Sequence, residues 1–208
     1  MKLVVYLDFG LPSWLALGRI ERLVKENPVE LEWHAFSGSL GNIARSAIPD
    51  GEPDPLAAYR ARRARARQKA NQREFERQCE MLDLDVADCP RDIDAGGWLN
   101  GLEWVARAAP SAVPGYLDRA FTLIYREKLA GRQEAVAEVL SAAGCPIEGF
   151  ADFALADEVN SDTWKDSLLD RGILSTPALV LDEEVFLGRE HLPLISWMLE
   201  GRVGNPPV

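Results

Sequence analysis

Strand-forming sequence occurs only near the two ends of this chain of 208 residues. Residues 4–9 are apolar, β-branched or aromatic and end at a Gly/Pro turn, which predicts a buried strand. Residues 29–36 alternate between apolar and polar side chains, as a second strand does. The apolar residues of segment 14–24, between them, recur at helical spacing. This strand–helix–strand order favours two parallel strands joined by a right-handed crossover.

The middle of the chain has the pattern of helices and no convincing strand. We expect helices over residues 55–82, 98–108, 116–129, 133–143 and 160–170, the last with Asn160 as its capping residue. Strand sequence returns at residues 178–182 and 185–187, separated by a turn at Glu183-Glu184, and a last helix follows over residues 191–199.

The order of these elements predicts an α/β protein with a β-α-β … β-β-α sheet. We expect the sheet domain to comprise residues 1–54 and 172–208, and residues 55–171 to form a large all-helical insertion domain. A chain of this length can bury a sizeable core, and 47% of its residues are hydrophobic.

The overall charge limits the partners that we expect. A net charge of −10 repels phosphate backbones, which argues against nucleic acid as a partner. The sequence has no run of 18 apolar residues, and its first residues are too polar for the core of a signal peptide. We therefore predict a cytoplasmic protein with no membrane partner.

Basic residues are concentrated in one place, the segment of residues 60–73 (RARRARARQKANQR). This segment carries seven Lys or Arg residues and no acidic residue. Two interpretations are open: a patch that binds anions, or the solvated face of an Ala-rich helix whose charges are screened by salt.

The cysteines and histidines offer few candidates for chemistry. Cys79, Cys89 and Cys145 form no Cys-x-x-Cys motif and have no metal-ligand spacing, so we expect buried or free thiols and no metal. The turn after the first strand contains no cysteine and cannot exchange disulfides. His34 lies on an alternating strand, a position more typical of a structural partner than of a catalytic base.

Four stretches of the sequence resemble the DsbA family, and together they cover essentially the whole chain. Residues 6–16 are similar to the opening of 2-hydroxychromene-2-carboxylate isomerases and kappa-class glutathione transferases, with Leu11 where that motif has Ser. Residues 29–36 resemble the second strand of the family, and residues 171–181 (RGILSTPALVL) resemble the loop that contains its cis-proline. Residues 185–192 resemble the segment before the final helix. The resemblance implies a thioredoxin-like sheet with a helical insertion.

The same resemblance implies a ligand site at the start of the first helix. A cis bond before Pro177 would leave the backbone of Thr176 free to pair with an extended ligand such as glutathione. Arg189 and Glu190 replace the two residues that hold the glutamyl end of glutathione in relatives that use it, and an Arg can still pair with a carboxylate. The binding residues implied for glutathione or substrate are Leu11, Pro12, Trp14, Asn42, Thr176, Pro177, Arg189 and Glu190.

Two functions remain open from the sequence. In the first, Ser13 lies at the N-cap or first position of the helix and stabilises the thiolate of bound glutathione, in an isomerase or transferase that acts on a hydrophobic small molecule. In the second, Ser13 only caps the helix, and the protein binds a peptide or metabolite without bond chemistry. Residues 12–16 (PSWLA) favour the enzyme, thiol–disulfide exchange is the least favoured activity, and a homodimer is compatible with the sequence.

Overall fold

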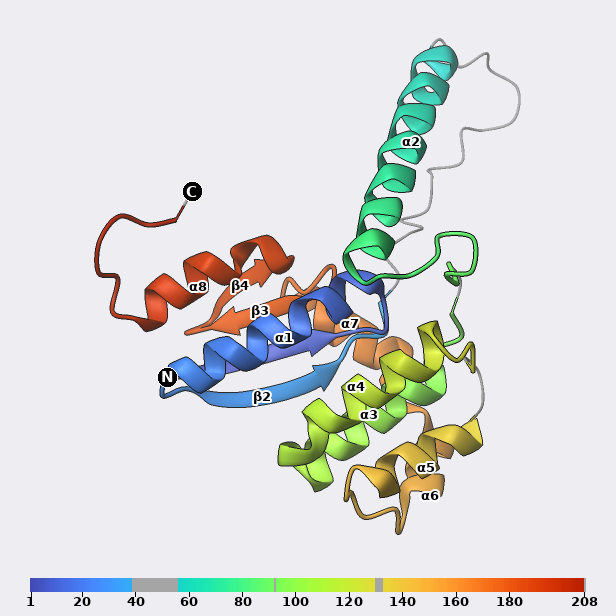
Figure 1. Ribbon diagram of the computed structural model, residues 1–208, viewed down its shortest axis with the longest axis vertical. Helices are drawn as coiled ribbons and strands as arrows, with labels where there is room; N and C mark the ends of the chain where they lie inside the picture. The colour runs from blue at the N-terminus through green and yellow to red at the C-terminus, as the bar shows by residue number, and fades with distance from the viewer. Residues whose placement is uncertain (39–55, 92, 130–132, 208) are drawn as a thin grey trace. The chain divides into compact units, whose positions relative to one another are not determined.

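The computed structural model describes residues 1–38, 56–91, 93–129 and 133–207. The strands are β1 (Lys2–Leu7), β2 (Glu30–Ala35), β3 (Ala178–Leu181) and β4 (Glu184–Leu187). The α-helices are α1 (Leu11–Glu26), α2 (Ala57–Met81), α3 (Gly96–Ala108), α4 (Val113–Tyr125), α5 (Gln133–Ala142), α6 (Phe150–Ala156), α7 (Asp162–Asp170) and α8 (Leu192–Leu199), with short 3-10 helices η2 (Pro110–Ala112), η3 (Glu158–Asn160) and η4 (Arg189–His191) (Figure 1).

The strands form one mixed sheet in the order β2-β1-β3-β4. β1 is parallel to β2, as predicted from the strand–helix–strand order, and antiparallel to β3. β3 and β4 form an antiparallel hairpin. Its two-residue turn is Asp182-Glu183, one position earlier than expected, and both residues have positive φ angles of 49° and 71°. Two such residues match the right-handed twist of a hairpin, which explains the shift.

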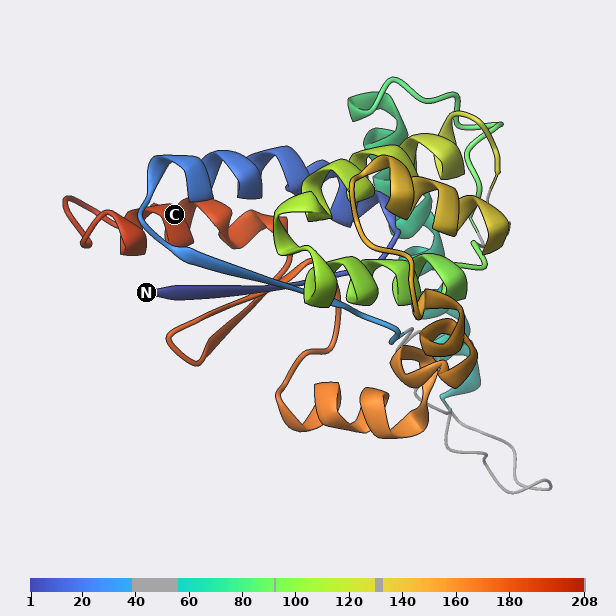
Figure 2. The ribbon, with the colours of Figure 1, turned by 90° about the horizontal axis from the view of Figure 1, so that it is seen from below.

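Helices cover both faces of the sheet. Helices α1 and α8 lie side by side on one face, whereas α7 lies on the other (Figure 2). The side chains of Leu3, Val5 and Leu7 are fully buried, as are those of Ala16 and Ile20 on α1. On the opposite face, the buried side chains of Tyr6, Phe36, Leu168, Ile173 and Ala178 form a second cluster.

The helix boundaries differ from the sequence predictions at several points. Helix α7 is capped by Ser161, whose Oγ accepts the Trp164 N–H at 3.2 Å, and not by Asn160. Helix α4 begins and ends a few residues earlier than expected. The short helix α6 was not predicted, because its seven residues contain too few turns for a clear periodicity.

The chain forms two compact units that do not coincide with the expected domains. One unit comprises residues 1–38 and 90–208, and the other comprises residues 39–89. Helices α3 to α7 belong to the unit of the sheet, because α3 packs on β2 and also contacts α4, α5 and α6. The second unit contains α2 among its described residues.

Cys79, Cys89 and Cys145 are buried, as predicted, and form no disulfide bond with one another. Among the described helices, none is long and apolar enough to cross a membrane.

Candidate functional site

Three loops meet at one end of the sheet. The antiparallel pairing between β1 and β3 ends with Tyr6 opposite Ala178. The turn after β1 and the loop before β3 therefore lie at the same end of the sheet. Ala178 also pairs with Leu187, and the N–H of Gly188 donates to the Pro177 carbonyl at 2.8 Å. The segment after β4 therefore lies beside the proline loop.

The first helix begins two residues before Ser13. Gly10 is the N-cap of α1, and it offers no side chain for a capping hydrogen bond. Ser13 is the third helical residue, so its predicted place at the N-cap or first helical position is wrong. Its hydroxyl is fully buried and donates to Asp8 Oδ1 at 2.6 Å, and the same oxygen accepts the Gly10 N–H at 3.0 Å.

This arrangement changes which groups face a ligand at the helix start. The N-cap and the first helical position are occupied by Gly10 and Leu11, neither of which carries a hydroxyl or thiol. The Leu11 side chain is buried, and Pro12 is half-buried. Within the described ranges, the backbone N–H of Leu11 meets no acceptor. It is therefore an unpaired donor at the positive end of the helix dipole.

Contacts with α4 hold this turn in place. The Tyr125 hydroxyl donates to the Phe9 carbonyl at 2.8 Å. The Trp14 ring stacks on the rings of Phe121 and Tyr125 with centroid distances of 5.5 and 5.4 Å, and the Arg126 guanidinium lies 5.6 Å from the Trp14 centroid. The Trp14 side chain of α1 thus packs against α4 and holds the two helices together.

The loop before β3 presents an unpaired backbone. The Thr176–Pro177 peptide bond is cis, Pro177 is buried and Thr176 is half-buried. Among the residues that the structure describes, neither the N–H nor the carbonyl of Thr176 finds a hydrogen-bond partner. A half-buried backbone with unused donor and acceptor groups is suited to pairing with an extended ligand.

The segment after β4 supplies two charged side chains. Arg189 and Glu190 open the 3-10 helix η4, directly after Gly188 with its positive φ of 99°. The Glu190 carboxylate folds back over Gly188, where a Cβ atom would collide with it. Of the predicted site residues, those that the structure describes come to this end of the sheet. Trp14, in the first turn of α1, packs on α4, and Asn42 lies outside the described residues.

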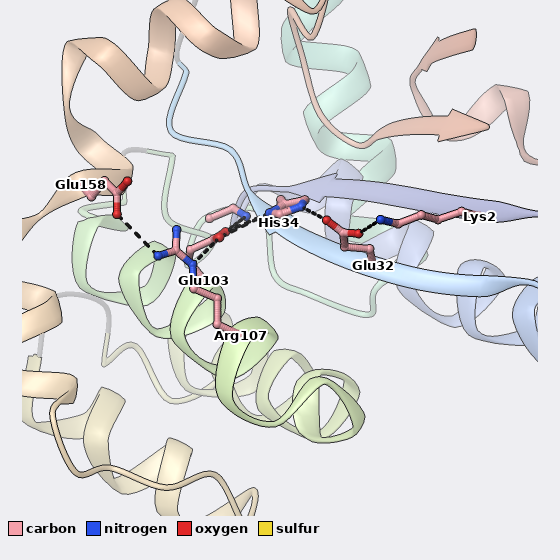
Figure 3. A network of polar contacts seen from close by, with 7 residues as sticks. Lys2, Glu32, His34, Glu103, Arg107 and Glu158 are labelled. Atoms are coloured by element: carbon pink, nitrogen blue, oxygen red, sulfur yellow. Dashed lines mark hydrogen bonds and ion pairs between the residues drawn. The ribbon is translucent and has the colours of Figure 1, made fainter. Parts of the chain in front are cut away.

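A second polar network crosses from the sheet to α3 and η3. Figure 3 shows this alternating chain of charges, which consists of Lys2, Glu32, His34, Glu103, Arg107 and Glu158. Sequence reasoning missed Glu103, although an acidic residue on the apolar face of a predicted helix is a recognisable signal of a buried partner.

At the centre of this network, His34 lies between two carboxylates. Its Nε2 is 2.6 Å from Glu32 Oε1, and its Nδ1 is 3.3 Å from Glu103 Oε1. The ring also stacks on Tyr6, with a centroid distance of 5.2 Å. Burial alone would lower the pKa of His34, but the hydrogen bonds and charges of Glu103 and Glu32 outweigh it, so the pKa is raised above its ordinary value of 6.5.

Glu103 is the most deeply buried member of the network, with 1% of its side chain exposed. Burial would raise its pKa, but His34, the Ala35 N–H and Arg107 together hold the pKa below its ordinary value of 4.5. The Ala35 N–H and the Arg107 Nε each donate to it at 3.1 Å. The network therefore fastens α3 to β2, which gives His34 the structural role expected from its strand position.

These pKa shifts predict a pH window for the stability contributed by the His34–Glu103 pair. Because the pKa of His34 is raised in the folded protein, its protonated ring stabilises the fold below pH 6.5. This contribution is lost as the pH rises through the pKa that His34 has in the folded protein. Because the pKa of Glu103 is lowered in the folded protein, its carboxylate stabilises the fold above pH 4.5. This contribution is lost as the pH falls through the pKa that Glu103 has in the folded protein. We expect His34→Gln to lower the free energy of unfolding most between pH 4.5 and pH 6.5, and to lower it less below and above this range. Urea unfolding of both proteins from pH 3.5 to 9 measures this difference, and a difference independent of pH would contradict the assignment.

Comparisons with known proteins add evidence on the fold. No protein-family model matches the chain, and no curated protein sequence matches it. A solved structure of a selenomethionine 2-hydroxychromene-2-carboxylate isomerase matches with a TM-score of 0.63 and 18% sequence identity, covering 98% of this chain and 95% of its own. At this identity the match shows the fold alone. The chain has a thioredoxin-like fold with a helical insertion.

Proposed function

We propose that this protein binds glutathione at the end of the sheet formed by the β1–α1 turn, the cis-proline loop and η4. The bound thiol then serves an isomerase or transferase reaction on a hydrophobic small molecule. The reaction class rests on the likeness in fold to 2-hydroxychromene-2-carboxylate isomerase and on the resemblance of residues 12–16 to the opening of that enzyme family.

The observation that carries the proposal is the unpaired backbone of Thr176. Glutathione is an extended peptide, and its cysteinyl backbone offers one donor and one acceptor to a strand edge. Thr176 supplies the complementary pair beside the cis bond and at the same end of the sheet as α1. Because the residue is half-buried, a ligand there would satisfy two groups that otherwise depend on solvent.

Charge at η4 suits the glutamyl end of the same ligand. This end carries a carboxylate and an ammonium group, and Arg189 and Glu190 carry the opposite charges. The thiol would lie at the start of α1, where the Leu11 N–H and the helix dipole favour a negative charge.

Ser13 is assigned a positioning role in this proposal. Its hydroxyl donates a hydrogen bond to the Asp8 carboxylate, which also accepts a hydrogen bond from the Gly10 N–H. Ser13 and Asp8 together therefore fix the turn that precedes the Leu11 N–H. Removal of the Ser13 hydroxyl would loosen this turn without removing a group that touches the thiol.

A second candidate function is the binding of a peptide or metabolite without bond chemistry. It is favoured by the Gly10-Leu11 helix start, which lacks a hydroxyl or thiol, and by the Asp8 carboxylate, whose negative charge in the same turn opposes a thiolate. The two functions differ in the pKa of a bound thiol, which only the first requires to be lowered.

Calorimetry of glutathione binding tests the proposal. We expect wild-type protein to bind glutathione at or below millimolar concentration, and Arg189→Ala to weaken binding by roughly 10-fold, as expected for loss of a hydrogen bond to a charged group. Arg202→Ala is the matched control, since Arg202 is an exposed arginine in the segment after α8 and should leave the affinity unchanged. Absence of binding by the wild type would refute the proposal.

The absorbance of the thiolate, measured against pH in the complex, separates the two candidate functions. A bound thiol whose pKa equals that of free glutathione supports binding without activation. A lowered pKa of the bound thiol supports the first function. If Ser13→Ala then raises this pKa only slightly, the positioning role of Ser13 holds.

A further inference from the structure

One stretch of α2 exposes its side chains on every side. Each residue from Tyr59 to Asn71 is exposed, and the seven basic residues of segment 60–73 lie within or next to this stretch. A helix of this length normally gains most of its stability from packing one face against other elements. Among the described residues, this part of α2 shows no such face, so its surface is available to a partner.

Like charges are stacked along this helix. Arg62, Arg65, Lys69 and Arg73 are separated by three, four and four residues, so they form one continuous basic stripe, which we call the α2 stripe. Like charges at these spacings destabilise a helix. The C-terminal part of α2 differs, because there Arg77 pairs with Glu74. An acidic partner would offset the repulsion along the α2 stripe.

The charge of the remaining chain decides which partner fits. The whole chain carries −10, and segment 60–73 carries seven positive charges, so all other residues together carry −17. A phosphate backbone that approached the helix would be repelled by this remainder. A bilayer surface is also disfavoured, because the stretch has no apolar face to insert. A protein that brings a short acidic stripe to this helix, without a continuous charged backbone, meets less of this repulsion.

A complementary acidic stripe lies on α7. Asp162, Asp166 and Asp170 are exposed and four residues apart, so they lie along one side of the helix over about 12 Å. The α2 stripe extends over about 16 Å, which is long enough to face all three carboxylates. Two cations lie close to the α7 stripe: Lys165, 3.7 Å from Asp162, and Arg171, which covers the Tyr6 ring.

We propose that the α2 stripe binds the α7 stripe of a second copy of this chain. Each copy carries one α2 stripe and one α7 stripe, so a second copy supplies the acidic partner that the α2 stripe requires. Exposed ion pairs contribute little individually and are screened by salt, so the association is weak and depends strongly on ionic strength. The proposal is independent of glutathione binding.

Sedimentation velocity of the full chain tests self-association. We expect a monomer–dimer equilibrium at 50 mM NaCl, with a dissociation constant at least ten-fold higher at 500 mM NaCl. The triple variants R62E/R65E/K69E and D162K/D166K/D170K should each be monomeric at both salt concentrations. Circular dichroism of each variant verifies that the helices remain folded.

Mixing the two triple variants is the decisive experiment. Each carries a reversed stripe complementary to the other, so the mixture should form a heterodimer at 50 mM NaCl although neither variant dimerises alone. The control D118K/E138K/E148K makes the same change in net charge at exposed acidic residues outside α7 and should still dimerise.

Three results would overturn the proposal. A wild-type protein that is monomeric at every salt concentration would do so, as would a control variant as impaired as the α7 variant. The third is salt-sensitive binding of a 20-base-pair DNA duplex that is lost in R62E/R65E/K69E, because it would assign the α2 stripe to nucleic acid.

Discussion

Glu103→Ala is expected to lower the free energy of unfolding by about 3 kcal/mol at pH 6, the low end of the cost of breaking a buried ion pair. The substitution removes the acceptor of the Ala35 N–H and leaves His34 and Arg107 without their shared carboxylate. We place the effect at the low end because His34 and Arg107 are 22% and 46% exposed, so water can partly replace the lost partner.

Equilibrium urea unfolding measures this loss, and Glu158→Ala is the matched control. Glu158 also pairs with Arg107, at 3.5 Å, but it is exposed, so its removal should cost less than about 1 kcal/mol. Equal effects of the two substitutions would show that burial of Glu103 does not determine the stability of this network.

Gly101→Ala is expected to lower the free energy of unfolding by about 3 kcal/mol, near the upper end of the cost of overpacking a core. A Cβ atom at Gly101 in α3 would lie within 3.0 Å of both the Tyr116 hydroxyl and the Val136 side chain. Both side chains are buried, and the Tyr116 hydroxyl already donates to the Trp98 carbonyl at 2.8 Å. The added methyl group would therefore separate α3 from α4 and α5.

Gly18→Ala provides the matched control for this experiment. Gly18 lies on the exposed side of α1, and a Cβ atom there meets no other atom within 4 Å. The same change should stabilise the protein by roughly 0.5–1 kcal/mol, because alanine loses less backbone entropy than glycine in a helix. Thermal or urea unfolding of both variants tests the contrast, and a Gly101→Ala variant as stable as wild type would contradict the described packing of α3.

The elements with strong local patterns could be predicted from the sequence. β1, α1 and β2 were found because buried strands and amphipathic helices have different periodicities, and the parallel pairing followed from their order. The start of α1 was misplaced because Ser13 was assumed to cap the helix that contains it. Its hydroxyl instead bonds to Asp8, and the preceding Pro12 belongs to the first helical turn.

The candidate site depended on contacts that no local pattern reveals. Glu103 and His34 are 69 residues apart, and only the packing of α3 on β2 brings them together. The docking of Trp14 between α1 and α4 likewise depends on Phe121 and Tyr125, which are remote in the sequence. Residue types could therefore suggest which side chains matter, whereas their partners required the tertiary structure.

The hydrogen bond from Tyr125 to the Phe9 carbonyl has a consequence for the motion of the candidate site. The turn before α1 cannot open by itself, because its backbone is tied to α4 and the neighbouring Trp14 is stacked against the same helix. Fluctuations that expose the start of α1 must therefore also loosen α4, so the two belong to one cooperative unit of local unfolding. Substitutions on the buried face of α4 would then change ligand affinity through the population of open states, without touching the ligand.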